Sequence, residues 1–213
     1  MKKIIAINAS PRKNWNTAQL VKAAAEGAAS AGAEIEVIDL YKLDAYQGCM
    51  SCFACKTEKS FGRCAYHDGL YDVLEKIRTA DGLIIGSPNY LSNLTAGFRA
   101  LYERLIFQSL TYNKEAPNCN NHRIPVLLIT TSNCIEEMYG AIGYDKMLES
   151  YQQTLTNFVG PTEVMICGDT LQVQDYSKYN WTMFDSEAKK KHHDETFSTY
   201  LENAKVRGSN LLK

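Results

Sequence analysis

The sequence predicts an α/β fold in which helices cover both faces of a parallel sheet. Short apolar runs rich in β-branched residues alternate along the chain with longer amphipathic stretches. The short runs are almost continuously apolar, as expected for strands that are buried on both sides. No internal repeat or low-complexity segment interrupts the alternation.

Each expected strand is a short apolar run, and each expected helix is a longer amphipathic stretch. The runs KIIAIN, EIEVID, LIIGS, PVLLITT and EVMIC predict strands at residues 3–8, 34–39, 83–87, 125–131 and 163–167. Helices are expected at residues 16–31, 68–79, 94–108, 144–158 and 186–205. The last helix is highly charged, so we expect one face to pack and the other to be solvated. Five strands with intervening helices predict a flavodoxin-like doubly wound five-stranded parallel sheet.

The whole chain, residues 1–213, is expected to form a single domain. Two stretches lack clear periodicity. The first is a cysteine-rich insertion at residues 41–67, and the second begins a C-terminal helical extension at residues 171–213. Long stretches without periodicity in a compact domain are commonly functional, so the cysteine-rich insertion is a candidate for chemistry.

Composition excludes several classes of protein. Lys and Arg number 23 and Asp and Glu 24, so the net charge of −1 provides no field that would attract nucleic acid or an anionic membrane. No apolar run approaches the ~20 residues of a membrane span, and no signal peptide is recognisable. We therefore expect a cytoplasmic protein. In a reducing compartment its seven cysteines should not form a disulfide framework.

A polar loop, residues 8–17, joins the first strand to the first helix. Ser10 and Thr17 offer hydroxyl donors, Asn16 an amide and Arg12 a charge, and the start of the helix adds free backbone N–H groups. Together these groups suit a phosphate. The glycine patterns of nucleoside-triphosphate and dinucleotide loops are missing. The alternative is that these residues only cap a helix and make a turn.

The pattern S-P-R-x-x-x-N-T in this loop resembles the FMN-phosphate loop of the NADPH-dependent FMN reductase family. The resemblance covers residues 1–170 and implies that Ser10, Arg12, Asn16 and Thr17 hold the phosphate of FMN. A second segment, G-S-P-N-Y at residues 86–90, resembles the family loop that borders the isoalloxazine ring. By that resemblance the flavin-binding residues are Pro88, Asn89, Tyr90, Leu91, Ser92 and Asn93, with Ser132 from the loop after the next strand.

The second segment is also chemically sensible for a flat ring. Pro88 makes the loop rigid, and Tyr90 offers an aromatic face. Backbone amides of the loop can bind the polar edge of a ring. The alternative is that Tyr90 only packs against the protein.

Four cysteines with the spacing C-x2-C-x2-C-x8-C are candidate metal ligands: Cys49, Cys52, Cys55 and Cys64. The opening C-x2-C-x2-C is that of the bacterial ferredoxin motif, although the ferredoxin ending is missing. A structural zinc site usually has two C-x2-C pairs much farther apart. Three basic side chains inside the segment would offset the charge of a thiolate-bound metal: Lys56, Lys59 and Arg63.

The cysteine segment resembles the compact motif of the iron–sulfur flavoproteins, a branch of the same family with a four-iron cluster beside FMN. The last gap, of eight residues, is longer than that branch leads us to expect. Three possibilities stay open at this point: a [4Fe-4S] cluster, zinc, or metal-free thiols. The four cysteines are therefore ligands on condition that a cluster is present.

The resemblance implies an FMN-binding domain that acts as an NAD(P)H oxidoreductase. FMN carries the redox chemistry, so no catalytic acid, base or nucleophile is expected from the chain. Electrons would pass from the nicotinamide through FMN to a small-molecule or protein acceptor, through the cluster if it is present. The alternatives are a reductase with FMN alone that acts on a quinone or free flavin, a flavodoxin-type electron carrier, and a zinc-bearing interaction module. By resemblance we expect a homodimer or homotetramer.

Overall fold

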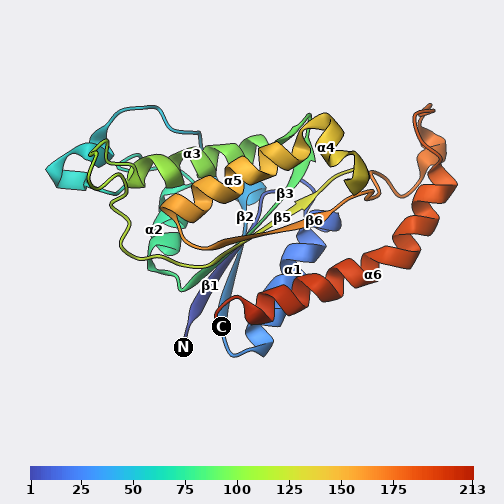
Figure 1. Cartoon of the computed structure of the whole chain (residues 1–213), viewed down its shortest axis with the longest axis horizontal. Coiled ribbons are helices and arrows are strands. Elements are labelled where there is room, and N and C mark those ends of the chain that lie inside the picture. The colour runs from blue at the N-terminus through green and yellow to red at the C-terminus, as the bar shows by residue number, and fades with distance from the viewer.

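The computed structural model describes residues 1–213 and contains five parallel strands in the order β2-β1-β3-β5-β6 (Figure 1). The strands are β1 Lys3–Asn8, β2 Glu34–Asp39, β3 Gly82–Tyr90, β5 Val126–Thr131 and β6 Thr162–Cys167. Counting only these parallel strands along the chain, the order is 2-1-3-4-5, which is that of flavodoxin. The predicted flavodoxin-like fold is therefore confirmed.

Helices cover both faces of the sheet, and each face has its own apolar core (Figure 1). Alternate residues of β1 serve the two cores, with Ile5 and Ile7 in one and Ile4 and Ala6 in the other. The first core contains side chains of α2 Tyr71–Thr79, α3 Ala96–Ser109 and α5 Tyr144–Phe158. The second contains side chains of α1 Asn16–Ser30 and α6 Ser186–Asn210. A short helix, α4 Tyr139–Ile142, precedes α5.

The C-terminal helix α6 packs closely on α1. A Cβ atom added at Gly27 would lie 1.9 Å from the carbonyl oxygen of Lys205, and one added at Gly208 would lie 1.9 Å from that of Ala24. Only glycine allows the two backbones to approach so closely. Near the chain ends, the ammonium of Lys2 donates to the carbonyl oxygen of Leu212 at 3.4 Å.

The segment expected to be a loop after β3 is largely a hairpin. Strand β3 continues to Tyr90 and pairs in antiparallel fashion with β4, Asn93–Leu94. Leu91 and Ser92 join the strands with φ angles of 51° and 64°. Positive φ at both central residues is typical of the tight turn that matches the twist of a hairpin. Period-based reading missed this hairpin because β4 is only two residues long.

Other boundaries differ less from expectation. Helix α2 begins at Tyr71 instead of residue 68, and α6 extends to Asn210. The cysteine-rich insertion contains short 3-10 turns at Ala54–Lys56 and Glu58–Ser60.

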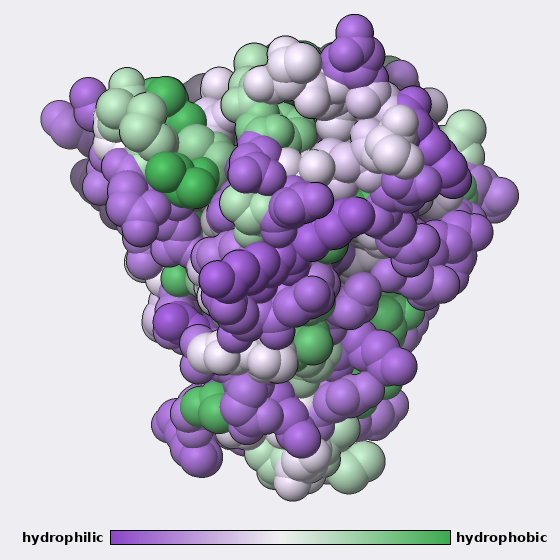
Figure 2. All heavy atoms as spheres, turned by 90° about the vertical axis from the view of Figure 1, so that its right-hand side faces the viewer, coloured by the Kyte–Doolittle hydropathy of each residue, from purple (hydrophilic) through white to green (hydrophobic).

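None of the helices combines the length and the apolar character that crossing a membrane requires. The side of the molecule that carries α6 and the segment before it is mostly hydrophilic, with apolar atoms in small separate patches (Figure 2).

Candidate functional site

A pocket of about 410 Å³ lies at the carboxyl edge of the sheet. In open α/β sheets ligands bind at this edge. Four segments form its wall: the loop after β1, the end of β3, the end of β5, and residues 170–172 after β6. The pocket brings together nine of the predicted flavin-binding residues: Ser10, Arg12, Asn16, Thr17, Pro88, Asn89, Tyr90, Leu91 and Ser132.

The start of α1 forms one side of this pocket. Trp15 is the N-cap residue and provides no side-chain acceptor, so the amides of the first turn lack the usual capping partner. Asn16 and Thr17 are nevertheless 5% and 2% exposed. The hydroxyl of Thr17 lies 2.8 Å from that of Thr131. Buried polar side chains beside uncapped amides are the features expected of an anion site.

The β3–β4 hairpin is fixed to the phosphate loop by Thr95. Its hydroxyl donates to the carbonyl oxygen of Ala9 at 2.7 Å and accepts from the amide of Phe98 at 3.3 Å, which caps α3. The hairpin places Tyr90 at the pocket with 45% of its surface exposed. Ser92 and Asn93 lie outside the pocket lining, because they form the turn and the return strand.

Two buried carboxamide oxygens in the pocket wall have no hydrogen-bond partner, namely Oδ1 of Asn89 and Oδ1 of Asn133. A buried acceptor without a donor costs about 1–3 kcal/mol, so such atoms usually indicate a missing ligand or water. A flat ring with polar edge groups would satisfy them. The residues present therefore fit FMN.

Ser132 is held in the wall by Tyr139. The two hydroxyls lie 2.7 Å apart, and Tyr139 is 4% exposed. Burial raises the pKa of Tyr139 to about 12, against the opposing effect of the hydrogen bond with Ser132. The phenol is therefore neutral near pH 7, and this side of the pocket carries no phenolate charge.

Sequence reasoning missed Trp15, Thr131 and the segment 170–172. The indole Nε1 of Trp15 and Nδ2 of Asn16 both donate to the carbonyl oxygen of Leu171, at 2.9 and 2.8 Å. The guanidinium of Arg12 donates to the carbonyl oxygen of Gln172. One signal was available: residues 170–172 follow the last predicted strand, and its carboxyl end belongs to the ligand-binding edge.

The four cysteines of the C-x2-C-x2-C-x8-C pattern line one small pocket: Cys49, Cys52, Cys55 and Cys64. The pocket is closed on the other side by residues of α3, including Arg104 and Phe107. All seven cysteines are free thiols. In this structure no three Cys, His, Asp or Glu side chains have the arrangement of metal ligands. The thiols thus share a pocket without converging on a common centre.

The backbone of the cysteine loop is folded tightly around this pocket. Ser51 and Phe53 have φ angles of 56° and 59°, and the amide of Ser51 donates to Sγ of Cys49 at 3.4 Å. Burial raises the pKa of the Cys55 thiol, and the neighbouring Lys56 opposes this shift. Soft thiol donors, N–H···S contacts and nearby cations are the surroundings that iron–sulfur clusters use. The donor set therefore fits a cluster in the type of its residues and their surroundings, although the thiols are not arranged around a common centre.

Lys56 fixes the loop to the C-terminal end of α3. Its ammonium donates to the carbonyl oxygens of Phe107 and Leu110 and, at 3.5 Å, of Gln108. It also lies 4.4 Å from the centre of the Phe107 ring. A cation at this end of a helix is favourable for the helix dipole and satisfies its unpaired carbonyl oxygens.

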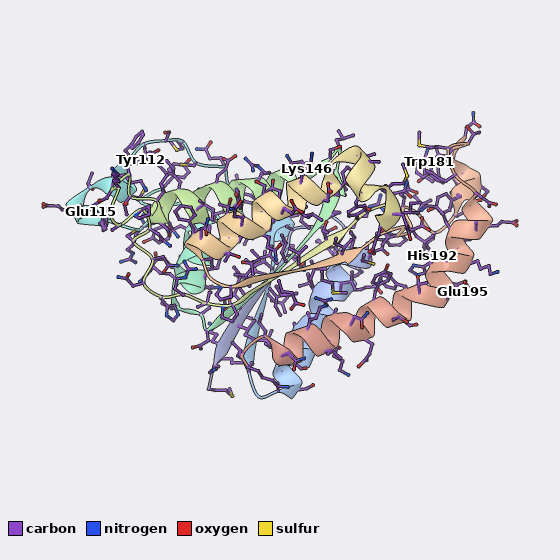
Figure 3. The ribbon with its side chains drawn as sticks, in the orientation of Figure 1. Tyr112, Glu115, Lys146, Trp181, His192 and Glu195 are labelled. Carbon is purple, nitrogen blue, oxygen red and sulfur yellow. The ribbon has the colours of Figure 1, made fainter.

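The two pockets lie at opposite ends of α3. Residues 88–91 just before α3 line the pocket at the sheet edge, whereas Arg104 and Phe107 near its end line the cysteine pocket. At 1.5 Å per residue the 14 residues of α3 span about 20 Å. In Figure 3, Tyr112 and Trp181 lie on opposite sides of the molecule, with Tyr112 on the side of the cysteine segment.

The sheet order and the pocket at its carboxyl edge define the chain as a flavodoxin-like α/β protein. The sequence pattern of the NADPH-dependent FMN reductase family matches residues 2–136, which is more than half of the chain. The protein belongs to this family. The resemblance predicted from its loops is confirmed.

Curated relatives resemble part of the chain. An iron–sulfur flavoprotein of Methanocaldococcus jannaschii is 37% identical over 102 residues, which make up 48% of this chain and 51% of that protein. An iron–sulfur flavoprotein of Methanosarcina thermophila is 34% identical over 104 residues, 49% and 52% of the two chains. The match therefore spans about half the length of these relatives.

Solved structures resemble the whole chain in fold. The NAD(P)H:quinone oxidoreductase of Methanothermobacter marburgensis has a TM-score of 0.69 at 17% identity, and covers 100% of this chain and 98% of its own. An azoreductase of Bacillus anthracis has a TM-score of 0.68 at 14% identity, with coverage of 99% and 100%. At these identities the likeness concerns the fold.

Proposed function

We propose that the protein is an FMN-dependent oxidoreductase that oxidises NADH or NADPH and passes the electrons to an acceptor. The observation that carries the proposal is the pocket at the sheet edge, where the uncapped start of α1 meets two unpartnered carboxamide oxygens. Bound FMN would supply the redox chemistry, because a flavin exchanges two electrons with a nicotinamide and one or two with an acceptor.

The chain's own residues would bind and orient the cofactor. We expect Arg12, Asn16 and Thr17, with the first amides of α1, to hold the phosphate. We expect Pro88 and Tyr90, which the hairpin brings to the pocket, to border the ring. We expect a nicotinamide, and then a small acceptor, to approach the flavin from the open side of the pocket. A quinone or another small aromatic acceptor is consistent with a half-exposed tyrosine at the entrance.

We further propose that Cys49, Cys52, Cys55 and Cys64 bind a four-iron cluster. Their common pocket supports this, and the curated relatives that match the chain are named iron–sulfur flavoproteins. Such a cluster would provide a one-electron carrier and direct electrons toward a protein acceptor. We expect the chain to assemble as a homodimer or homotetramer, which light scattering would measure.

Anaerobic purification followed by absorption spectroscopy tests the proposal. We expect flavin bands together with broad iron–sulfur absorbance, and loss of the flavin bands when NADH or NADPH is added. Flavin bands that persist with both nicotinamides would favour an electron carrier of the flavodoxin type. Flavin without iron would leave a reductase with FMN alone, and a colourless protein would contradict the proposal.

A further inference from the structure

The C-terminal extension reaches into the pocket at the sheet edge, although it lies beyond the residues that match the family pattern, 2–136. The strap, defined here as residues 169–172, joins β6 to this extension and lies against the start of α1. Two carbonyl oxygens of the strap receive three side-chain donors of the phosphate loop, from Arg12, Trp15 and Asn16.

These contacts orient the side chains of Arg12 and Asn16 and leave some of their N–H groups free to bind a ligand. The guanidinium of Arg12 has five N–H groups, and the amide of Asn16 has two. One group of each is bonded to the strap, which fixes the side chain and leaves the others free for an anion. A side chain that is already ordered loses less conformational entropy when a ligand binds.

The strap is in turn anchored by a buried lysine of α6. Lys189 is 5% exposed, forms an ion pair with Asp169, and donates to the carbonyl oxygen of Asn133 at 3.2 Å. Asp169 has a φ angle of 48°, in the left-handed region that aspartate adopts more readily than most residues. His192 lies 3.9 Å from the same carboxylate and faces the sheet from α6 (Figure 3).

A second anchor holds the other end of the strap. The buried hydroxyl of Tyr176 accepts from the amide of Gln172 and donates to its side-chain oxygen, both at 3.1 Å. The ring of Tyr176 packs edge-on against Trp181 and Phe184. The strap is thus fixed at Asp169 and at Gln172, on both sides of the carbonyl oxygen that Trp15 and Asn16 share.

We propose that Lys189 is a positioning residue for the phosphate of FMN, acting through Asp169 and the strap on Arg12 and Asn16. The inference rests on the proposed FMN site. It assigns to the C-terminal extension a part of the cofactor site. Removal of the ammonium would leave His192, at 3.9 Å, as the basic neighbour of Asp169 and would remove one anchor of the strap, so we expect the phosphate donors to be less ordered.

The test compares FMN with riboflavin, which has the same ring and lacks the phosphate. In Lys189→Met we expect the dissociation constant of FMN to rise on the order of tenfold, while that of riboflavin stays unchanged. Lys189→Arg should restore most of the FMN affinity. The control is Lys191→Met, because Lys191 is on the same helix with its side chain 76% exposed.

Equal weakening of both flavins in Lys189→Met would show a general structural effect and overturn the proposal, and so would unchanged affinity for both. Tyr176→Phe decides the matter if Lys189→Met does not fold, since it removes only the hydroxyl at the second anchor. The same selective loss of FMN affinity is expected there, and an unchanged FMN affinity would contradict the proposal. If the wild type binds no FMN, the proposed function itself fails.

Discussion

Arg104 and Asp68 form a buried ion pair that closes the two ends of the cysteine segment. Their nearest atoms lie 2.5 Å apart, and the side chains are 1% and 7% exposed. The guanidinium also donates to the carbonyl oxygen of Tyr66 at 2.7 Å, and Asp68 accepts from the amide of Gln47 at 3.2 Å. The residues just before the first cysteine and just after the last are thus fastened to α3 by one pair.

Replacement of Arg104 by Met should therefore be strongly destabilising. Asp68 would remain buried without its partner, and breaking such a pair costs about 3–5 kcal/mol of unfolding free energy. Denaturant unfolding monitored by circular dichroism measures the loss. Arg78→Met is a suitable control, because Arg78 is 42% exposed and its pair with Glu75 is worth about 1 kcal/mol or less. A cost for Arg104→Met no larger than that of the control would show that the pair does not close the segment.

The cysteine pocket predicts equal effects for its second and its last cysteine. Cys52→Ala and Cys64→Ala should each lose most of the iron and labile sulfide, because either change opens a coordination position. FMN content should stay the same in both, since the pockets lie at opposite ends of α3. Cys119→Ala, outside this pocket, is the control. Iron retained in Cys64→Ala alone would require a different fourth ligand.

Tyr90→Ala should weaken flavin binding and alter the visible absorption of the flavin. The side chain is 45% exposed in the absence of ligand, so its loss removes little core packing, and the free energy of unfolding should fall by less than about 1 kcal/mol. Tyr112→Ala, on an exposed tyrosine near the cysteine segment, should leave the flavin spectrum unchanged. Lower stability with an unchanged flavin spectrum would mean that Tyr90 serves packing alone.

Glu36 should contribute to stability in a defined range of pH. Hydrogen bonds from Lys76 and then Lys3 hold the pKa of this carboxyl below its ordinary value of 4.5. The contribution of the Glu36 carboxylate to the free energy of unfolding is therefore fully present above pH 4.5. It is lost as the pH falls through the lower pKa of the folded state. Glu36→Gln should cost about 0.5–1 kcal/mol near pH 7, and the cost should shrink progressively as the pH falls below 4.5.

Urea unfolding of the Glu36→Gln variant at several pH values measures this difference. Glu34→Gln, on an exposed residue of the same strand, serves as the control. A difference between wild type and Glu36→Gln that is constant from pH 3 to pH 7 would mean that the carboxylate charge is not the cause.

The main elements of the fold were predictable because both faces of the sheet are buried. Strand β1 reads as an apolar run with the observed limits, and α5 was predicted at its observed residues. The turn at Leu91 and Ser92 was not predictable, because neither residue is among those that usually adopt positive φ. Because of that turn, Asn93 lies outside the pocket lining, although it was predicted to bind the flavin.

The candidate site, like the fold, was predictable from the sequence only in part. Local patterns identified the phosphate loop and the cysteines, whose members lie within short stretches of sequence. The contacts of Lys189 with Asp169 and of Trp15 with Leu171 join residues 20 and 156 positions apart. Such contacts depend on how α6 packs on α1, and no sequence period encodes them. A lysine in a charged helix reads as a solvated residue until the packing shows that it is buried.

The central claim is that the pocket at the carboxyl edge binds FMN through the start of α1. Thr17 tests the claim because its hydroxyl is a buried donor beside the uncapped amides. Loss of one hydrogen bond to a charged group costs about 1.5–3 kcal/mol, which corresponds to a ten- to hundredfold rise in dissociation constant. Thr79→Ala, on an exposed threonine of α2, is the matched control.

The decisive measurement is a titration of the apoprotein with FMN and with riboflavin, for the wild type and for Thr17→Ala, monitored by flavin fluorescence. We predict one FMN per chain, tighter binding of FMN than of riboflavin, and a loss in Thr17→Ala that affects FMN alone. Absence of saturable FMN binding by the wild type, or equal affinity for FMN and riboflavin, would contradict the assignment of this pocket.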